Sequence, residues 1–262
     1  MSDPTHERRF RHEPRPDKST STGTQGIMEL VLLHALPFDG SMWDRQRDLL
    51  PITSHAPTLY DLGNTLPEWA TAVLQQVRGD RLIVVGNSIG GSCALEMAAL
   101  APERIAALVL IGTKASHRPD ASLHATALST LSGQGVEAAW NLYWAPLFST
   151  SASPKLLAHA MGLATAIDAR TIARGVTAFH TRPGREMLVP TLRCPIVCVS
   201  GEHDVAPGRR TSQTQANSAK DGRLIIVPNC GHYVPLEQPG QMNAVLRSLV
   251  HELMSPPGSV PT

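Results

Sequence analysis

The sequence predicts an α/β fold in which a mostly parallel, doubly wound sheet carries helices on both faces. Short apolar runs alternate with helical stretches from Met28 to Met254. Runs such as 82–85 are apolar throughout, which is typical of parallel strands covered by helices on both sides. A long interval without strands, residues 116–187, predicts a helical lid inserted between core strands.

The elements are expected in the following chain order. The expected strands lie within residues 28–34, 55–62 (the weakest), 81–88, 104–113, 195–202 and 223–232. The expected core helices are residues 41–50, 67–77, the stretch after Ser88, and 239–254. The lid is expected as four helices over residues 122–134, 136–148, 154–165 and 168–180.

These elements divide the chain into a core, a lid and two tails. The core comprises residues 27–115 and 188–254, and the lid comprises residues 116–187. Residues 1–26 are polar and lack the apolar centre of a secretion signal, so we expect a disordered tail. Met28, which opens the first strand, is an alternative start of the chain. Residues 255–262 form the second expected tail.

The composition excludes several classes of partner. With 262 residues and a formal charge of +1, the chain gives no electrostatic reason to expect nucleic acid or an anionic membrane. It contains no apolar run of about 18 residues, the length that a membrane span requires. Its four cysteines are too few and too scattered for a disulfide framework (Cys93, Cys194, Cys198 and Cys230). Cys194 and Cys198 flank a strand-like run, whereas the ligand pairs of zinc sites usually lie on turns, so a zinc site is not expected. We expect a cytoplasmic protein without metal or cofactor, and homo-oligomerisation is left open.

One turn carries the strongest chemical signal. The apolar run 82–85 stops at Gly86-Asn87-Ser88-Ile89-Gly90, and helical spacing begins immediately afterwards. A serine at the apex of a strained strand-to-helix turn needs small neighbours, which explains Gly86 and Gly90. Serine is a weak nucleophile at neutral pH and needs a base that is oriented by an acid. The turn therefore predicts Ser88 as a catalytic nucleophile.

Two further strand ends supply the expected partners. Asp204 follows the strand that ends near Ser200, and His232 follows the strand that ends near Val227. The carboxyl ends of parallel strands meet at one edge of a sheet, and the chain order Ser, Asp, His suits this kind of turn. A lone Asp is usually a helix cap and a lone His is usually solvated. Their joint occurrence predicts a triad of Ser88, Asp204 and His232.

The loop after the first strand predicts the remaining part of the site. The backbone N–H of Ile89, at the start of a helix, and that of Leu36 in "HALPFDGSMW" could stabilise an oxyanion. His34 is expected to brace this loop rather than to take part in proton transfer.

Together these motifs resemble the α/β-hydrolase superfamily over residues 28–254. The turn at 86–91 resembles its nucleophile elbow, Gly201-Glu202-His203-Asp204 its acid loop, and Gly231-His232 with Glu237 and Pro239 its histidine loop. The compact form looks most like the enol-lactonase and small-ester hydrolase branch. Relatives often begin with a hairpin before the first strand, whereas residues 1–26 do not read as strands.

The resemblance implies a serine hydrolase that cleaves a small-molecule carboxylic ester or lactone through an acyl-enzyme. Dehalogenase and epoxide-hydrolase chemistry is disfavoured, because those relatives carry a carboxylate where Ser88 stands. Two alternatives stay open: a carbon–carbon bond hydrolase of the meta-cleavage product type, and a ligand sensor that keeps the triad but turns over slowly.

The pocket is the least specified part of the site. Aromatic residues of the lid and of the first loop are candidates for its lining, although lid core is the commoner role for such residues (Trp144, Phe148, Tyr143 and Phe38). Arginines of the lid could pair with a substrate carboxylate, although solvated arginines on helices are more common (Arg170, Arg174, Arg182 and Arg185).

Overall fold

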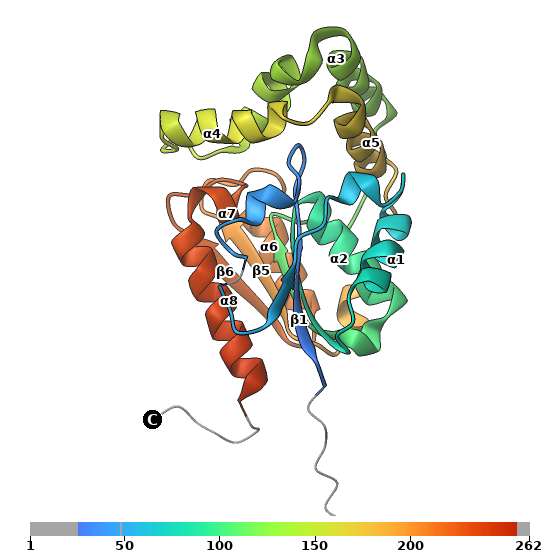
Figure 1. Ribbon diagram of the computed structural model, residues 1–262, viewed down its shortest axis with the longest axis vertical. Coiled ribbons are helices and arrows are strands. Elements are labelled where there is room, and N and C mark those ends of the chain that lie inside the picture. Colours follow the sequence, from blue (N-terminus) through green and yellow to red (C-terminus); the bar gives the residue numbers. More distant parts are fainter. Residues whose placement is uncertain (1–25, 48, 256–262) are drawn as a thin grey trace, which may run out of the picture.

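The computed structural model describes residues 26–47 and 49–255. The predicted tails, 1–26 and 255–262, lie outside these residues except for Gly26 and Ser255. Between them the chain forms a single six-stranded sheet with helices against both faces (Figure 1). The predicted fold class, a parallel doubly wound sheet, is therefore confirmed.

The sheet is parallel at every strand pair, in the order β2-β1-β3-β4-β5-β6. Since β2 and β3 flank β1 on opposite sides, the strand order reverses at β1, and open α/β sheets place their sites at such a reversal. The strands are β1 (Met28–Leu33), β2 (Thr53–His55), β3 (Arg81–Asn87), β4 (Ile105–Ile111), β5 (Ile196–Gly201) and β6 (Gly222–Val227).

Helices cover the sheet on both sides. Figure 1 shows α1 (Leu66–Gln76) and α2 (Ile89–Leu100) on one side and α8 (Pro239–Met254) on the other. Nearly all of α2 is buried, because it lies against β3, β4 and α1. The remaining core helices are α6 (Arg209–Ser218), which packs on β5 and β6, the short α7 (Val234–Glu237), and the 3₁₀ turns η3 (Pro102–Arg104) and η6 (Val189–Thr191).

A helical insert lies between β4 and β5, at the end of the sheet where β1 terminates (Figure 1). Its elements are α3 (Ala121–Ala139), the π-helical turn η4 (Trp140–Trp144), the 3₁₀ turn η5 (Ala145–Leu147), α4 (Pro154–Thr165) and α5 (Ala169–His180). Side chains of Asp120, Ser153 and Asp168 cap the three α-helices by accepting N–H bonds of the first turn. We call residues 121–180 the helical insert.

Three predicted elements differ from the structure. The helix expected over 136–148 is instead the end of α3, followed by η4 and η5. Instead of a helix over 41–50, the chain forms the 3₁₀ turn η1 (Gly40–Trp43), which Asp39 caps. Pro51 disfavours helical conformation at the residue before it, so a helix could not extend through Leu50. Instead of a strand over 55–62, β2 ends at His55 and the 3₁₀ turn η2 (Leu59–Asp61) follows, because Pro57 has no N–H for a strand ladder.

Helix α6 was not expected from the sequence. Its sequence RRTSQTQANS lacks apolar periodicity, and its buried face consists of Ser212, Gln215 and Ala216. The Gln215 amide replaces apolar packing with hydrogen bonds: Oε1 accepts from Ala115 N (2.8 Å) and Nε2 donates to Cys198 Sγ (3.6 Å). A polar side chain with buried partners leaves no hydrophobic signal in the sequence.

Among residues 26–47 and 49–255, no helix has the length and apolar character needed to cross a membrane. Within the same ranges, no group of three or more His, Cys, Asp or Glu side chains is arranged to hold a metal ion.

Candidate active site

Ser88 occupies a sharp turn between β3 and α2. Its backbone angles are φ 56° and ψ −115°, a region that L-residues rarely adopt. Glycines permit the turn: a Cβ on Gly86 would lie 2.3 Å from the Gly90 backbone, and one on Gly90 would lie 2.1 Å from Leu33 O. The turn is anchored by the Ser88 N–H, which donates to Ile111 O at 2.8 Å. The backbone therefore holds Ser88 at the carboxyl end of the central strands.

Asp204 and His232 form a buried pair beyond the ends of β5 and β6. The Nδ1 atom of His232 lies 3.1 Å from Asp204 Oδ1, and the two residues are 3% and 6% exposed. Ala206 N also donates to Asp204 Oδ1 (2.8 Å), which fixes the carboxylate. Gly112, at φ 51°, lies against the pair, because a Cβ there would be 2.6 Å from His232 Nδ1. The arrangement leaves Nε2 as the free nitrogen of the imidazole.

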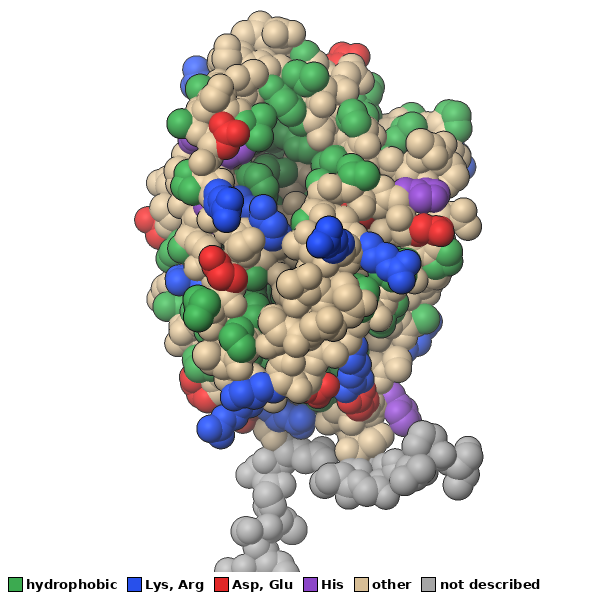
Figure 2. Space-filling model, turned by 180° about the vertical axis from the view of Figure 1, so that it is seen from behind, with side chains coloured by type: hydrophobic (Ala, Val, Ile, Leu, Met, Phe, Trp, Pro, Cys, Tyr) green, Lys and Arg blue, Asp and Glu red, His purple; other side chains and the backbone are tan. Residues whose placement is uncertain are grey.

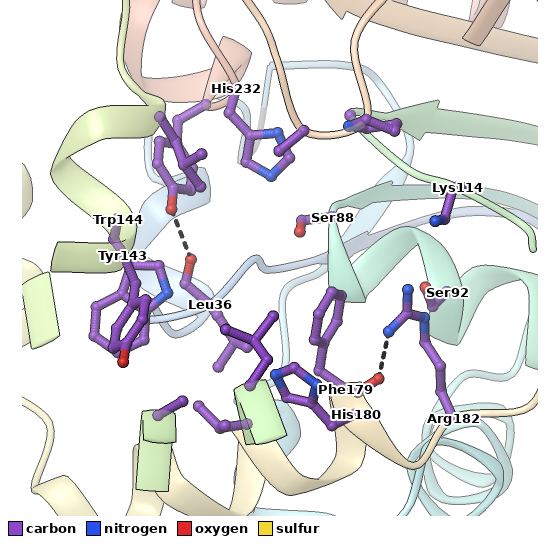
Figure 3. Close-up of a pocket in the computed structure, with 18 of the residues that line it drawn as sticks. Leu36, Ser88, Ser92, Lys114, Tyr143, Trp144, Phe179, His180, Arg182 and His232 are labelled. Carbon is purple, nitrogen blue, oxygen red and sulfur yellow. Dashed lines mark hydrogen bonds between the residues drawn. The ribbon is translucent and has the colours of Figure 1, made fainter. Parts of the chain in front are cut away.

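Ser88 and His232 line the same cavity, of about 380 Å³ (Figure 3). Within the described chain the Ser88 hydroxyl makes no hydrogen bond to His232, so the structure brings the two residues to one cavity without joining them. Catalytic hydrogen bonds are often long in unliganded sites and shorten when substrate binds.

The two expected oxyanion donors belong to the loop after β1 and to the start of α2. Leu36 follows β1 and lines the cavity, and Ile89 is the first residue of α2, where N–H groups have no intrahelical acceptor. Neither N–H donates a hydrogen bond within the described residues. The Leu36 carbonyl accepts from the Tyr233 hydroxyl (3.1 Å), which fixes the orientation of this peptide.

His34 is fully buried beneath the same loop. Its Nε2 accepts from Leu59 N (2.8 Å), so its Nδ1 carries the proton and donates to Ala35 O (3.2 Å). Burial lowers the pKa of His34 to about 4, so the ring is neutral at pH 7. His34 thus connects the loop after β1 to η2 and does not line the cavity.

Two residues without an expected role hold the histidine loop. The Glu237 carboxylate accepts N–H bonds from Gly231 (2.9 Å), Tyr233 (3.1 Å) and Ser149 (2.9 Å). The Asn87 amide donates to His232 O (3.2 Å) and to Ile111 O (3.1 Å). Glu237 stood in the histidine-loop motif, but only the folded chain shows what its carboxylate binds. Asn87 joins the turn at Ser88 to the histidine loop.

Of the four aromatic residues expected in the pocket, two line the cavity and two do not. Tyr143 and Trp144 line the cavity, as expected. Phe38 and Phe148 do not: both pack on the buried Tyr233 ring, with centroid distances of 5.1 and 4.7 Å. For these two the pocket assignment was wrong: Tyr233 lines the cavity, and Phe38 packs on its ring edge-to-face while Phe148 packs on it at a tilt.

The four arginines also have different surroundings. Arg170 and Arg174 are exposed on α5, as expected of solvated arginines. Arg185 forms a bidentate pair with the buried Glu96 (2.7 and 2.8 Å). Arg182 is 8% exposed and lines the cavity, so the expectation of a solvated side chain is wrong there.

Comparisons with known proteins agree with this architecture. The sequence profile of the alpha/beta hydrolase family matches residues 30–245. The chain is 27% identical to lipase LipV of Mycobacterium tuberculosis over 252 residues, covering 86% of this chain and 94% of the lipase. A thermophilic esterase from Thermogutta terrifontis superposes with a TM-score of 0.79 at 21% identity, over 88% of this chain and 91% of the esterase.

The enol-lactonase from Burkholderia xenovorans LB400 superposes with a TM-score of 0.75 at 19% identity, over 86% of this chain and 91% of the lactonase. At this identity the two structures demonstrate a shared fold. The family profile extends from β1 into α8 and includes the turn at Ser88 and the loops of Asp204 and His232. The chain therefore belongs to the alpha/beta hydrolase family.

Proposed function

We propose that the protein is a serine hydrolase that cleaves a small carboxylic ester or lactone through an acyl-enzyme. The observation that carries the proposal is the buried Asp204–His232 pair, whose histidine lines the same cavity as a serine held at positive φ. A neutral imidazole with its Nδ1–H held by a carboxylate presents Nε2 as a base toward the cavity. The names of the lipase, esterase and lactonase relatives support ester or lactone bonds as the target.

In the proposed first step, Ser88 Oγ attacks the substrate carbonyl while His232 Nε2 takes the hydroxyl proton. The negative charge that develops on the carbonyl oxygen is stabilised by the N–H groups of Leu36 and Ile89. The carboxylate of Asp204 stabilises the imidazolium. When the tetrahedral intermediate collapses, His232 returns the proton to the leaving alkoxide and the acyl group stays on Ser88.

Water completes the reaction by the same route. His232 takes a proton from the water as its oxygen attacks the acyl-enzyme, and then returns the proton to Ser88 Oγ. The products are the carboxylic acid and the free serine. For a lactone the alcohol remains on the same molecule, so one hydroxy acid is released. Within this proposal the helical insert acts as a lid, because Tyr143, Trp144 and Val176 cover the cavity.

Ser88→Ala tests the nucleophile. We expect turnover of 4-nitrophenyl acetate to fall roughly 10⁴–10⁶-fold with an unchanged circular dichroism spectrum, because the members of a triad act as a unit. A fluorophosphonate should form a stoichiometric adduct with the wild type and none with Ser88→Ala, as measured by intact mass. Ser129→Ala, an exposed serine of α3, is the matched control and should keep both adduct and turnover.

An adduct that persists in Ser88→Ala would show that another residue is the nucleophile. Ser92 would then be the next candidate, because this serine also lines the cavity.

A further inference from the structure

The cavity has two chemically different sides. Figure 3 shows Tyr143 and Trp144 on one side of Ser88, and Ser92, Lys114 and Arg182 together on the other. Figure 2 shows a hollow that contains hydrophobic side chains and is bordered by Lys and Arg side chains. No Asp or Glu of residues 26–47 or 49–255 lines the cavity. The side with Arg182 is therefore positively charged without an internal counter-charge.

Arg182 is the centre of this charge. It follows α5, it is 8% exposed, and its guanidinium carbon lies 3.9 Å from the centroid of the Phe179 ring. Its NH1 donates to the Phe179 carbonyl, and it forms no salt bridge within the described chain. Burial lowers the pKa of Arg182 to about 10, so the side chain is still a cation at neutral pH. Buried arginines are normally paired with an acid, and this one has donors to spare.

The neighbours of Arg182 add positive charge and a hydrogen-bond donor to this side of the cavity. Lys114 is exposed at the edge of the cavity and has no ion-pair partner among the described residues. The Ser92 hydroxyl lines the cavity and makes no hydrogen bond within the described chain. His117 and His180 lie close enough that the charge of Arg182 contributes to lowering the pKa of each, after the larger effect of burial. Two cations and a hydroxyl thus converge on a space that holds no acid.

We propose that Arg182, Lys114 and Ser92 form a carboxylate-binding subsite, and that the substrate is an ester or lactone with a second, anionic carboxylate group. The guanidinium would bind the carboxylate through charge-assisted hydrogen bonds, and the Lys114 ammonium and Ser92 hydroxyl would add donors. The aromatic side at Tyr143 and Trp144 would take the apolar remainder. The substrate class rests on the proposed hydrolase function, whereas the anion site itself can be tested without turnover.

The test compares esters that differ in one charge. On the acyl side, methyl hydrogen glutarate carries a carboxylate and methyl pentanoate has a methyl group in its place. On the alcohol side, the acetate ester of 3-hydroxypropanoate carries a carboxylate and the acetate ester of 1-propanol has a methyl group in its place. We expect the wild type to prefer the charged member of one pair by at least about tenfold in kcat/KM, the factor expected for charge-assisted hydrogen bonds.

Substitutions then locate the preference. Arg182→Met should lower the ratio of charged to neutral kcat/KM roughly ten- to hundredfold, and Arg182→Lys should restore part of it. Lys114→Met should reduce the ratio less, and, because this side chain is exposed, it provides a variant that folds even if Arg182→Met does not. Arg170→Met, on the exposed face of α5, removes the same charge away from the cavity and should leave the ratio unchanged.

A binding measurement separates the two proposals. Isothermal titration of Ser88→Ala with methyl hydrogen glutarate and with the acetate ester of 3-hydroxypropanoate should give a Kd for one of them that weakens roughly tenfold or more when Arg182→Met is added. If the wild type turns over neither pair while this Arg182-dependent binding persists, the anion site stands and the hydrolase function is wrong. If Ser88-dependent hydrolysis occurs at equal rates on both members of both pairs, the hydrolase function stands and the subsite is overturned.

Discussion

Two carboxylates follow β5 within three residues, and their surroundings differ. Asp204 is buried and its Oδ1 lies 3.1 Å from His232 Nδ1, whereas Glu202 is exposed and its Oε2 accepts from Asn229 N at 3.0 Å. A buried carboxylate beside an imidazole stabilises the protonated ring and fixes the tautomer. An exposed carboxylate on a backbone N–H can do neither.

We therefore expect Asp204→Asn to lower kcat roughly 10³–10⁴-fold and Glu202→Gln to change it less than about threefold. The matched pair removes one charge at each position without changing side-chain size. Steady-state kinetics on 4-nitrophenyl acetate measures both variants. Similar losses in the two would mean that the acid of the site has been misplaced.

His34 should make stability depend on pH. Burial lowers its folded-state pKa to about 4, below the value of about 6.5 in an unfolded chain, so the unfolded state binds more protons between these values. The free energy of unfolding should therefore fall as pH drops from 6.5 to 4, by up to about 3 kcal/mol from this residue alone. Urea denaturation across this range measures the slope.

His34→Gln should flatten that slope, and His251→Gln, an exposed histidine on α8, should leave it unchanged. The same His34 variant separates bracing from proton transfer. If His34 only holds the loop of Leu36, we expect kcat to fall while the acidic limb of the rate profile stays where it was. A shift of that limb in the variant would make His34 part of the proton chemistry.

At the scale of elements, we expect the π-helical turn η4 to matter most for specificity. It carries two buried tryptophans, of which Trp144 lines the cavity and Trp140 packs against Phe38 (6.2 Å between centroids) outside it. Replacing either removes a similar buried volume, so both variants lose stability, by about 3–5 kcal/mol. Only one of them changes the shape of the cavity.

We accordingly expect Trp144→Ala to alter the ratio of kcat/KM for short and long acyl esters, and Trp140→Ala to lower thermal stability while keeping that ratio. Labelling of Ser88 by a small fluorophosphonate should persist in both folded variants. Loss of labelling in a folded Trp144→Ala protein would show that the insert builds the reactive centre itself rather than the substrate pocket.

The elements that could be predicted are those whose core faces are apolar. β3, β4 and the insert helices α4 and α5 follow directly from hydrophobic periodicity. α6 could not be predicted because its Gln215 is buried through hydrogen bonds rather than apolar packing. The turn η2 could not be predicted from the sequence, because its Leu59 N–H donates to His34, a residue 25 positions away in the chain.

At the scale of the whole molecule, chain order and strand ends were enough to predict that Ser88, Asp204 and His232 lie at one edge of the sheet. The contact between Asp204 and His232 depends on the path of two loops, and on Gly112 leaving room for the ring. The cationic side of the cavity could not be predicted, because the burial of Arg182 depends on its stacking on Phe179 after α5 ends. Periodicity contains no information about such a contact.

The bonds between the helical insert and the histidine loop limit how the protein can be recombined with its relatives. His232 N donates to Leu147 O (2.9 Å), and Ser149, which donates to Glu237, has its Oγ 2.7 Å from His203 Nδ1. Residues 147–149 thus lie within the insert by sequence but are bonded to the two loops that carry Asp204 and His232. A chimera that exchanges the whole insert would replace these partners together with the pocket. Crossovers that keep 147–149 with the core would transfer substrate preference while preserving the geometry of the imidazole.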